Sequence, residues 1–211
     1  MRRDVALSAV TGCRYHVCHV SAKETLAIIR QAKRDGVRVS CEITPHHALL
    51  CDGDITGDDG RFKMNPPLRD ETDRQAIWQA LQDGTADAIA TDHAPHSAAE
   101  KGRGLEKSAM GIVGLETAFS TLHTGLVQKG ILSLERLLWL LTYGPARVLG
   151  VPCGILPGNS ADLVLIDPAC RHTIDSTAFY SMGNSTPFDG WQVTGKVVRT
   201  IYQGKTVYGE E

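Results

Sequence analysis

The apolar positions of the chain follow two periodicities, one typical of strands and one typical of helices. Short apolar runs predict strands at residues 15–20, 37–43 and 86–92. Apolar residues spaced at helical intervals predict helices at residues 21–36, 71–81, 114–128 and 133–150. Because the strands alternate with helices, the pattern favours an α/β fold with a parallel sheet.

The first predicted helix carries a recognisable start and stop. Ser21 is predicted to be its N-cap, and Glu24 stands where it would complete a capping box. Gly36 is predicted to end the helix. These signals place the helix between the first two strands.

The residue composition of the chain changes at about residue 151. Proline and glycine become frequent, and short β-prone runs follow at residues 161–166, 196–202 and 206–208. We therefore expect two parts, an α/β part over residues 1–150 and a small β-rich part over residues 151–211.

Polar residues stand at the ends of the first three predicted strands. His19 ends the first, residues 44–47 (with His46 and His47) end the second, and Asp92 ends the third. The carboxyl ends of parallel strands meet at one edge, where α/β proteins place their functional groups. Three polar strand ends in register therefore predict a functional site at that edge.

The third of these ends carries the sequence T-D-H-A-P-H at residues 91–96. A carboxylate close to two imidazoles suits metal-assisted hydrolysis, because it can bind a cation that carries hydroxide and accept a proton. The motif alone leaves an alternative open, in which Asp92 caps a turn and His93 and His96 are solvated.

Composition narrows the possible classes of protein. The chain has 211 residues, 42% of them apolar, and a net charge of −2, without a basic run of the kind that binds nucleic acid. The longest apolar run, near residues 137–142, is too short to span a bilayer. Six scattered cysteines without a C-x-x-C pair indicate reduced thiols, and we expect a cytoplasmic protein.

Five motifs occur in one order along the chain. They are C-H-V-S-A-K-E-T, I-T-P-H-H-A-L-L, K-M-N-P-P-L-R, D-G-T-A-D-A-I-A-T-D-H-A-P-H and G-I-V-G-L-E-T. Together they resemble the C-terminal part of the dihydroorotases of the class I bacterial type, in the amidohydrolase superfamily. The resemblance runs from about Asp4 to the end of the chain. M-N-P-P-L-R and T-D-H-A-P-H are its most specific pieces, since allantoinases and hydantoinases usually vary them.

The resemblance implies part of a (β/α)8 TIM barrel, about strands six to eight, followed by a small β-sandwich segment. It also implies zinc as cofactor, with two Zn²⁺ in a complete site. The implied reaction is the reversible cyclisation of N-carbamoyl-L-aspartate to dihydroorotate in pyrimidine biosynthesis.

The resemblance also assigns roles to individual residues. His19 matches a metal ligand, and Asp92 matches both a metal ligand and the general base. Four positions match substrate contacts: Asn65, His96, Met110 and Gly111. The family commonly has an aromatic residue where Met110 stands, which matters less if main-chain groups make the contact.

Other polar residues of the motifs are expected to have supporting roles. His46 and His47 are not needed by the family's ligand set, and we expect them either to support the metal ligands through hydrogen bonds or to be structural. His16 has no motif around it and is expected to be an ordinary histidine. Lys101 and Arg103 are expected in a solvated loop, with a lid over an anionic substrate as the alternative.

The remaining ligands of the family pattern have no counterpart in this sequence. They are an H-x-H pair, a bridging carboxylate and a further histidine, all on earlier barrel strands. The sequence therefore fits a C-terminal piece, a split or truncated reading frame, or a remnant. We expect a homo-oligomer or dependence on a missing N-terminal half.

Two other functions stay open beside dihydroorotase. One is another cyclic-amide hydrolase, similar to allantoinases or hydantoinases. The other is a non-catalytic, dihydroorotase-like subunit that supports aspartate transcarbamoylase.

Overall fold

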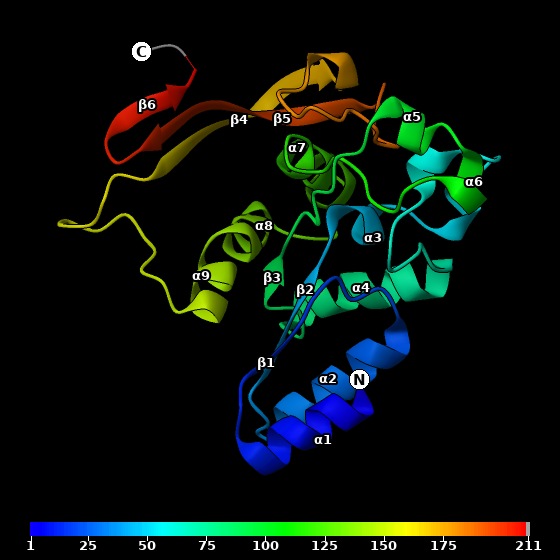
Figure 1. The fold of residues 1–211 in the computed structure, drawn as a ribbon. Coiled ribbons are helices and arrows are strands. Elements are labelled where there is room, and N and C mark those ends of the chain that lie inside the picture. Colours follow the sequence, from blue (N-terminus) through cyan, green and yellow to red (C-terminus); the bar gives the residue numbers. More distant parts are fainter. Residues whose placement is uncertain (210–211) are drawn as a thin grey trace.

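A computed structural model describes residues 1–209, and its centre is a parallel three-stranded sheet in the order β1-β2-β3 (Figure 1). These strands are β1 (Tyr15–Val17), β2 (Val39–Ile43) and β3 (Ala88–Ile89). Tyr15 lies opposite Val39 in the register of the first pair. The parallel sheet and the α/β class agree with the prediction from the sequence.

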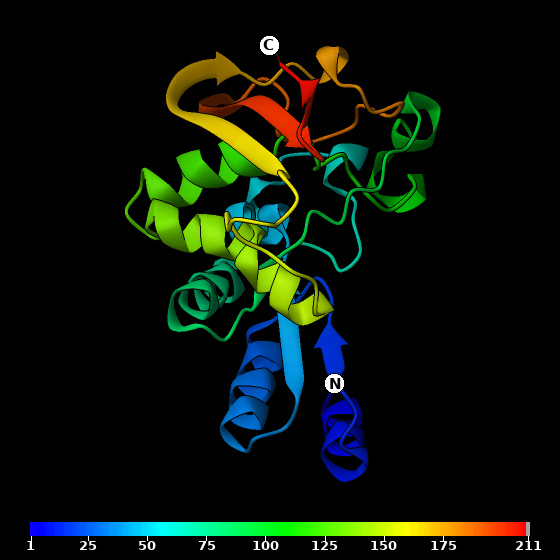
Figure 2. The ribbon, with the colours of Figure 1, turned by 90° about the vertical axis from the view of Figure 1, so that its left-hand side faces the viewer.

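A second sheet, antiparallel, follows later in the chain. It consists of β4 (Leu163–Thr173), β5 (Gln192–Tyr202) and β6 (Lys205–Tyr208) in that order. Figures 1 and 2 show this sheet at the end of the molecule opposite α1 and α2. The predicted β-rich segment is therefore present, while its assignment to a sandwich stays a prediction.

Nine α-helices surround and connect the sheets within residues 1–209. Their bounds are α1 (Arg2–Thr11), α2 (Lys23–Arg34), α3 (Pro45–Leu49), α4 (Glu71–Asp83), α5 (Ala98–Lys101), α6 (Gly104–Lys107), α7 (Ala118–Leu122), α8 (Leu134–Leu141) and α9 (Tyr143–Leu149). Short 3-10 turns η1 (Asp52–Asp54), η2 (Gly60–Phe62) and η4 (Ser176–Ala178) and the π-helix η3 (His123–Val127) complete the set. Within the described range, none of the helices has the length and apolar character to cross a membrane.

Helix α2 lies where the periodicity predicts it, but the prediction of its start is wrong. Its N-cap is Ala22, whose side chain makes no cap, and the expected capping box from Ser21 does not form. The backbone N–H of Lys23 instead donates to Asp73 Oδ1 of α4 at 2.7 Å. A carboxylate from a neighbouring helix thus satisfies one of the free N–H groups at the start of α2.

The two long helices predicted late in the chain are each divided. The first continues from α7 into the π-helix η3, and the second is interrupted at Thr142 between α8 and α9. Gly144 explains the position of α9, because a Cβ atom there would lie 2.1 Å from the carbonyl oxygen of Asp87. Only a glycine lets α9 approach the chain that leads into β3 so closely.

The antiparallel sheet packs on the α/β part through α7 and η3. The side chain of His123 contacts the carbonyl oxygen of Thr194 in β5 through Nδ1 at 3.0 Å. The backbone N–H of Thr194 donates to Thr124 Oγ1 at 2.8 Å. These bonds fix β5 against the helical layer.

Strand β1 is an edge of the parallel sheet within the described residues, with β2 as its neighbour. A hollow of about 580 Å³ lies beside it, at the end of the strands away from His19. Its lining includes Arg14, Arg38 and Arg147. Strand β1 therefore has one unpaired edge within residues 1–209.

We predict that Gly144→Ala lowers the free energy of unfolding by about 1–3 kcal/mol, because overpacking displaces α9 from β3. Gly57→Ala is the control, since no atom of the described residues lies within 4 Å of a Cβ at that position. Urea denaturation measures both variants, and the control should stay within about 0.5 kcal/mol of the original chain. Equal stability of the two variants would contradict the packing described for α9.

Candidate metal and substrate site

His19 and Asp92 lie just beyond the carboxyl ends of β1 and β3. Both adopt left-handed backbone angles, with φ of 40° for His19 and 49° for Asp92. Positive φ is uncommon for residues other than glycine, and strained residues cluster at functional sites. The two predicted metal ligands therefore share both their edge of the sheet and an unusual backbone conformation.

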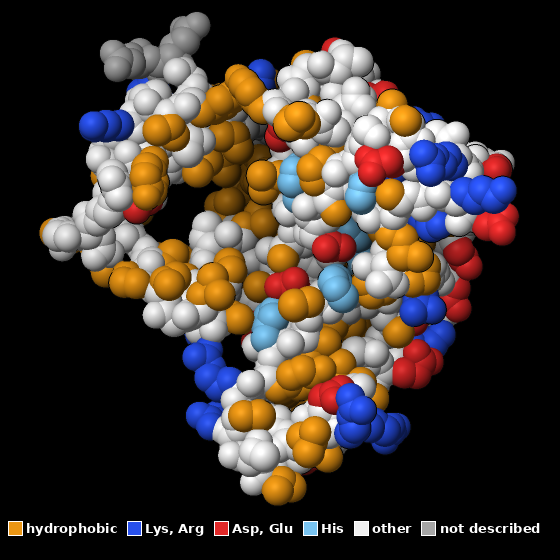
Figure 3. Space-filling view, viewed as in Figure 1, with side chains coloured by type: hydrophobic (Ala, Val, Ile, Leu, Met, Phe, Trp, Pro, Cys, Tyr) orange, Lys and Arg blue, Asp and Glu red, His pale blue; other side chains and the backbone are white. Residues whose placement is uncertain are grey.

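Backbone hydrogen bonds continue past the strands and hold this edge together. The N–H of Val20 donates to the carbonyl of Glu42 at 3.0 Å, and the N–H of Ala90 donates to that of Ile43 at 3.0 Å. The residues that follow β1 and β3 are thus both tied to the end of β2. Figure 3 shows histidine and acidic side chains gathered near the centre of this face.

The carboxylate of Asp92 is partly desolvated. Burial raises its pKa, the neighbouring His19 has the opposite effect, and Glu42 raises it further. The pKa is thus shifted toward the range in which a carboxylate accepts a proton effectively near neutral pH. The influence of His19 and Glu42 indicates that all three side chains share one electrostatic environment.

His46 and His47 are buried in the short helix α3 below this edge. Nδ1 of His47 shares a hydrogen bond of 2.7 Å with Thr44 Oγ1, and its Nε2 contacts the carbonyl of Pro66 at 2.9 Å. The rings of His46 and His47 lie 4.4 Å apart between centroids. Nε2 of His46 is buried and has no hydrogen-bond partner among residues 1–209.

Three of the predicted substrate residues, His96, Met110 and Gly111, lie together where two loops meet, and we call this group the loop cluster. Nε2 of His96 contacts the carbonyl oxygen of Met110 at 3.0 Å. Gly111 has a φ of +133°, and a Cβ there would lie 2.5 Å from that of Ala94. A glycine at 111 therefore lets this loop pass close to the segment after Asp92, and the main chain of Met110 is in contact with His96.

Asn65 belongs to a segment that reaches the same loop cluster. The N–H of Gly111 donates to the carbonyl of Lys63 at 3.0 Å, two residues before Asn65. The Asn65 residue itself is exposed. The structure thus brings its segment to Gly111 through backbone contacts.

Lys101 corrects the expectation of a solvated loop. Its side chain is buried, and Nζ donates to three carbonyl oxygens, those of Lys63 at 2.9 Å, Ala109 at 2.9 Å and Gly111 at 2.7 Å. Burial, with a smaller effect of the nearby Lys63 charge, lowers its pKa to about 8. Near neutral pH the ammonium group therefore has one donor for each carbonyl. Arg103 is exposed, as expected.

The geometry of this edge can be compared with proteins of known family. Residues 3–207 match the Amidohydrolase family. The chain belongs to the amidohydrolase family.

Relatives within the amidohydrolase family include dihydroorotases. The chain is 53% identical to the dihydroorotase of Geobacillus sp. strain WCH70 over 207 residues, which is 98% of this chain and 48% of the relative. It is 52% identical to that of Shouchella clausii strain KSM-K16, covering 99% of this chain and 49% of the relative. The chain therefore spans about half the length of these curated relatives.

Solved structures of other amidohydrolases have the same fold. The L-hydantoinase from Arthrobacter aurescens superposes with a TM-score of 0.90 at 33% identity, covering 99% of this chain and 48% of that one. The dihydropyrimidinase from Brevibacillus agri gives a TM-score of 0.91 at 27% identity, with 99% and 47% covered. The fold of this chain is thus shared with about half of each of these two longer proteins.

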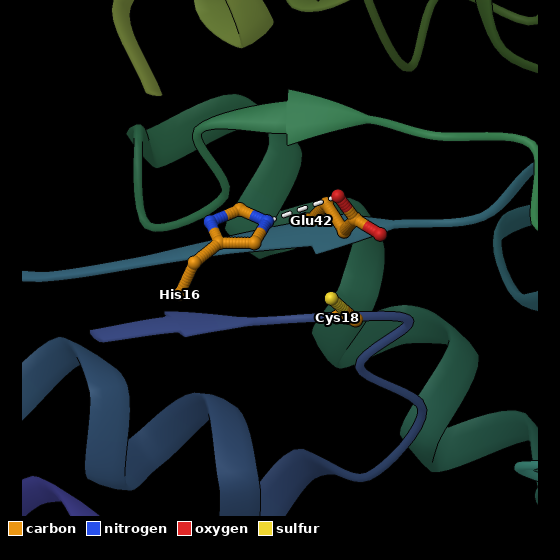
Figure 4. Close-up of side chains that lie close together, drawn as sticks. All are labelled: His16, Cys18 and Glu42. Carbon is orange, nitrogen blue, oxygen red and sulfur yellow. Dashed lines mark hydrogen bonds and ion pairs between the residues drawn. The ribbon is translucent and has the colours of Figure 1, made fainter. Parts of the chain in front are cut away.

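One group of polar residues of this amidohydrolase chain was missed by sequence reasoning. His16, Cys18 and Glu42 lie together on β1, the residue after it and β2, although His16 was expected to be ordinary (Figure 4). Burial raises the pKa of the Cys18 thiol, and the nearby Glu42 and Asp92 carboxylates raise it further. The signal in the sequence is the spacing of His16 and Cys18, but only the register of β1 and β2 shows that Glu42 joins them.

We predict that Lys101→Met lowers the free energy of unfolding by at least about 2 kcal/mol, because it removes three hydrogen bonds and leaves carbonyl groups unpaired. Arg103→Met is the matched control, since this arginine is exposed and should contribute within about 0.5 kcal/mol. Urea denaturation of both variants measures the difference. If Lys101→Met were as stable as the control, the three carbonyl contacts would not hold the loop cluster.

We also predict that acid destabilises the chain through His47. Burial lowers the pKa of this imidazole to about 4. Between about pH 6.5 and pH 4 the unfolded chain therefore binds a proton that the folded chain does not. The free energy of unfolding then falls, as the pH falls, by about 1.4 kcal/mol per pH unit for this group.

The test compares the original chain with His47→Gln by denaturation at several pH values in that window. The free energy of unfolding should change less steeply with pH in the variant. The difference in slope should be roughly 1.4 kcal/mol per pH unit, the value for one proton. Identical slopes in the two proteins would show that His47 is not held neutral by burial.

Proposed function

We propose that this chain contributes one part of the active site of a dihydroorotase. The reaction is the reversible, zinc-dependent cyclisation of N-carbamoyl-L-aspartate to dihydroorotate, a step of pyrimidine biosynthesis. The observation that carries the proposal is the meeting of His19 and Asp92, both with positive φ, at one edge of the parallel sheet. The identity of 53% to a dihydroorotase supports this choice of substrate.

In this proposal, β1, β2 and β3 are about strands six to eight of a (β/α)8 barrel. Residues 1–150 then belong to the barrel, and residues 151–211 belong to a small β-rich domain. The parallel order β1-β2-β3 and the separate antiparallel sheet support this division.

His19 and Asp92 are the residues of this chain that would hold zinc. Imidazole nitrogen and carboxylate oxygen are both donors that zinc accepts in catalytic sites. A catalytic zinc site needs about three protein ligands, so these two residues would need partners from the remaining half of the enzyme. When bound, zinc supplies a polarised carbonyl and a hydroxide nucleophile at neutral pH.

Asp92 is proposed as the group that moves the proton. It accepts a proton from the nucleophile during ring opening and returns it to the departing ring nitrogen. The raised pKa of Asp92 suits both steps, because a general base works best when its pKa approaches the working pH.

The loop cluster is proposed to bind dihydroorotate. The carbonyl of Met110 accepts a hydrogen bond from His96 Nε2–H, and His96 Nδ1, which lies 3.9 Å from Glu100 Oε2, is proposed to accept a hydrogen bond from a substrate N–H. Asn65 offers an amide with both donors and an acceptor, and the backbone at Met110 and Gly111 completes the binding surface.

A second candidate is a hydrolase of hydantoins or dihydropyrimidines. The TM-score of 0.90 with the L-hydantoinase from Arthrobacter aurescens favours it. The two candidates differ in whether the substrate carries a carboxylate on the ring.

The experiment combines the 211-residue chain with the complementary half of the Geobacillus dihydroorotase and measures hydrolysis of dihydroorotate. We expect no turnover from the chain alone and turnover from the mixture with zinc. Asp92→Asn in the mixture should lower kcat by roughly 10²–10⁴, because the amide cannot accept the proton. Asp52→Asn, on an exposed residue, is the matched control and should leave kcat unchanged.

Two outcomes would overturn the proposal. A mixture with Asp92→Asn that keeps kcat within about tenfold of the original would remove the proton-transfer role. A mixture that hydrolyses hydantoin or dihydrouracil faster than dihydroorotate would favour the second candidate.

A further inference from the structure

His16, Cys18 and Glu42 bring three different metal-binding atoms together on one side of the sheet. The Nε2 or Nδ1, Sγ and carboxylate oxygen atoms all lie within 4.8 Å of one another. Figure 4 shows His16 and Glu42 projecting from neighbouring strands, with the Cys18 sulfur directed toward Glu42. Nε2 of His16 and Oε2 of Glu42 are 2.9 Å apart.

The register of the sheet produces this cluster. His16 pairs with Ser40, and Val17 pairs with Cys41. Because side chains alternate along a strand, His16 shares a face with Ser40 and Glu42, while Val17 is directed to the buried core. The side chains with metal-binding atoms therefore lie on the polar face of β1 and β2, opposite the face that packs into the apolar core.

We propose that His16, Cys18 and Glu42 form a binding site for a borderline-soft divalent cation such as Zn²⁺, next to the His19 and Asp92 edge but with different ligands. The site shares no residue with that edge. The proposal is independent of the proposed dihydroorotase activity, and it concerns binding to this chain alone.

The donor set matches zinc in both charge and softness. On binding, the ion displaces the proton of the Cys18 thiol to solvent. The resulting thiolate and the Glu42 carboxylate carry two negative charges, which with a neutral imidazole balance a divalent ion. Nitrogen, sulfur and oxygen are the three kinds of donor that zinc accepts in proteins. Ca²⁺ and Mg²⁺ prefer oxygen ligands, so the sulfur disfavours them.

Ser40 is placed to orient the His16 ring. Its Oγ lies 2.7 Å from Nδ1 of His16, on the side of the ring away from Glu42. A metal-binding histidine typically has such a hydrogen-bond partner on its other nitrogen. With the metal bound, Nδ1–H donates to Ser40 and the Nε2 lone pair is free for the ion. Without it, the hydroxyl donates to Nδ1 and Nε2–H donates to Glu42.

The cluster is accessible and needs only a small adjustment to bind an ion. The side chains of His16 and Glu42 are 25% and 19% exposed, and Cys18 is exposed. Donor atoms around tetrahedral zinc lie about 3.3–3.8 Å apart, as bond lengths of about 2.0–2.3 Å require. The pair of His16 and Glu42 would therefore open by about half an ångström. The exposed side leaves room for a water molecule as the fourth ligand.

The test titrates the metal-free 211-residue chain with Co²⁺, a coloured substitute for zinc, and then displaces it with Zn²⁺. We expect one equivalent of Co²⁺ to give a thiolate-to-cobalt charge-transfer absorption, which Zn²⁺ then removes. Cys18→Ser should abolish this absorption. His16→Ala and Glu42→Gln should each weaken binding about tenfold or more. Circular dichroism confirms that each variant is folded.

Cys13→Ser is the matched control for the thiol, since Cys13 is also exposed but lies outside the cluster. It should leave the absorption and affinity unchanged. Ser40→Ala should weaken binding while the absorption stays, because Ser40 only orients the ring.

A second control separates this site from the proposed catalytic edge. The double variant His19→Ala, Asp92→Asn should keep the charge-transfer absorption and the affinity for Co²⁺. Loss of the absorption in that variant would assign the ion to the edge and overturn the proposal. So would an unchanged spectrum in Cys18→Ser, or the failure of the original chain to bind Co²⁺ and Zn²⁺.

Discussion

Parallel pairing of β1, β2 and β3 is the constraint on which the rest of this structure depends. It directs three strand ends to one edge, and backbone bonds from Val20 and Ala90 to the end of β2 extend the pairing beyond the strands. His19 and Asp92 leave this ladder with left-handed backbone angles. A fixed ladder is what allows two residues so far apart in sequence to meet in one electrostatic environment.

The loops beyond that edge are held by main-chain contacts. Lys101 donates to three carbonyl groups, and Gly111 allows its loop to approach the segment after Asp92. A buried ammonium is unfavourable unless its donors are satisfied, and here each donor has a carbonyl partner. These contacts hold the segments of Lys63, Ala109 and Gly111 together around the Lys101 ammonium.

Local patterns of the sequence were enough to predict the strands and the helices α2 and α4, because these elements depend on periodic burial. They did not predict the start of α2, which relies on Asp73, or the break before α9, which relies on close contact of Gly144 with Asp87. Both features come from residues distant in sequence. Burial of Lys101 escaped prediction for the same reason.

In the candidate site, too, some features follow from local sequence patterns and others depend on contacts between residues distant in sequence. The positions of His19 and Asp92 at strand ends follow from the pattern of the chain. His96 contacts the carbonyl of Met110, and the substrate-binding role of these two residues stays a proposal. The cluster of His16, Cys18 and Glu42 depends on the register between β1 and β2, which no local pattern specifies. Sequence reasoning therefore found the edge but not the donors on the sheet face below it.

The most direct test of the account is the position of zinc in a crystal of this chain combined with the complementary half of a dihydroorotase. Anomalous scattering at the zinc edge locates the ions without reference to activity. The account predicts a zinc ion within about 2.0–2.2 Å of a ring nitrogen of His19 or a carboxylate oxygen of Asp92. A zinc-loaded, active complex with no zinc bound to either residue would contradict it.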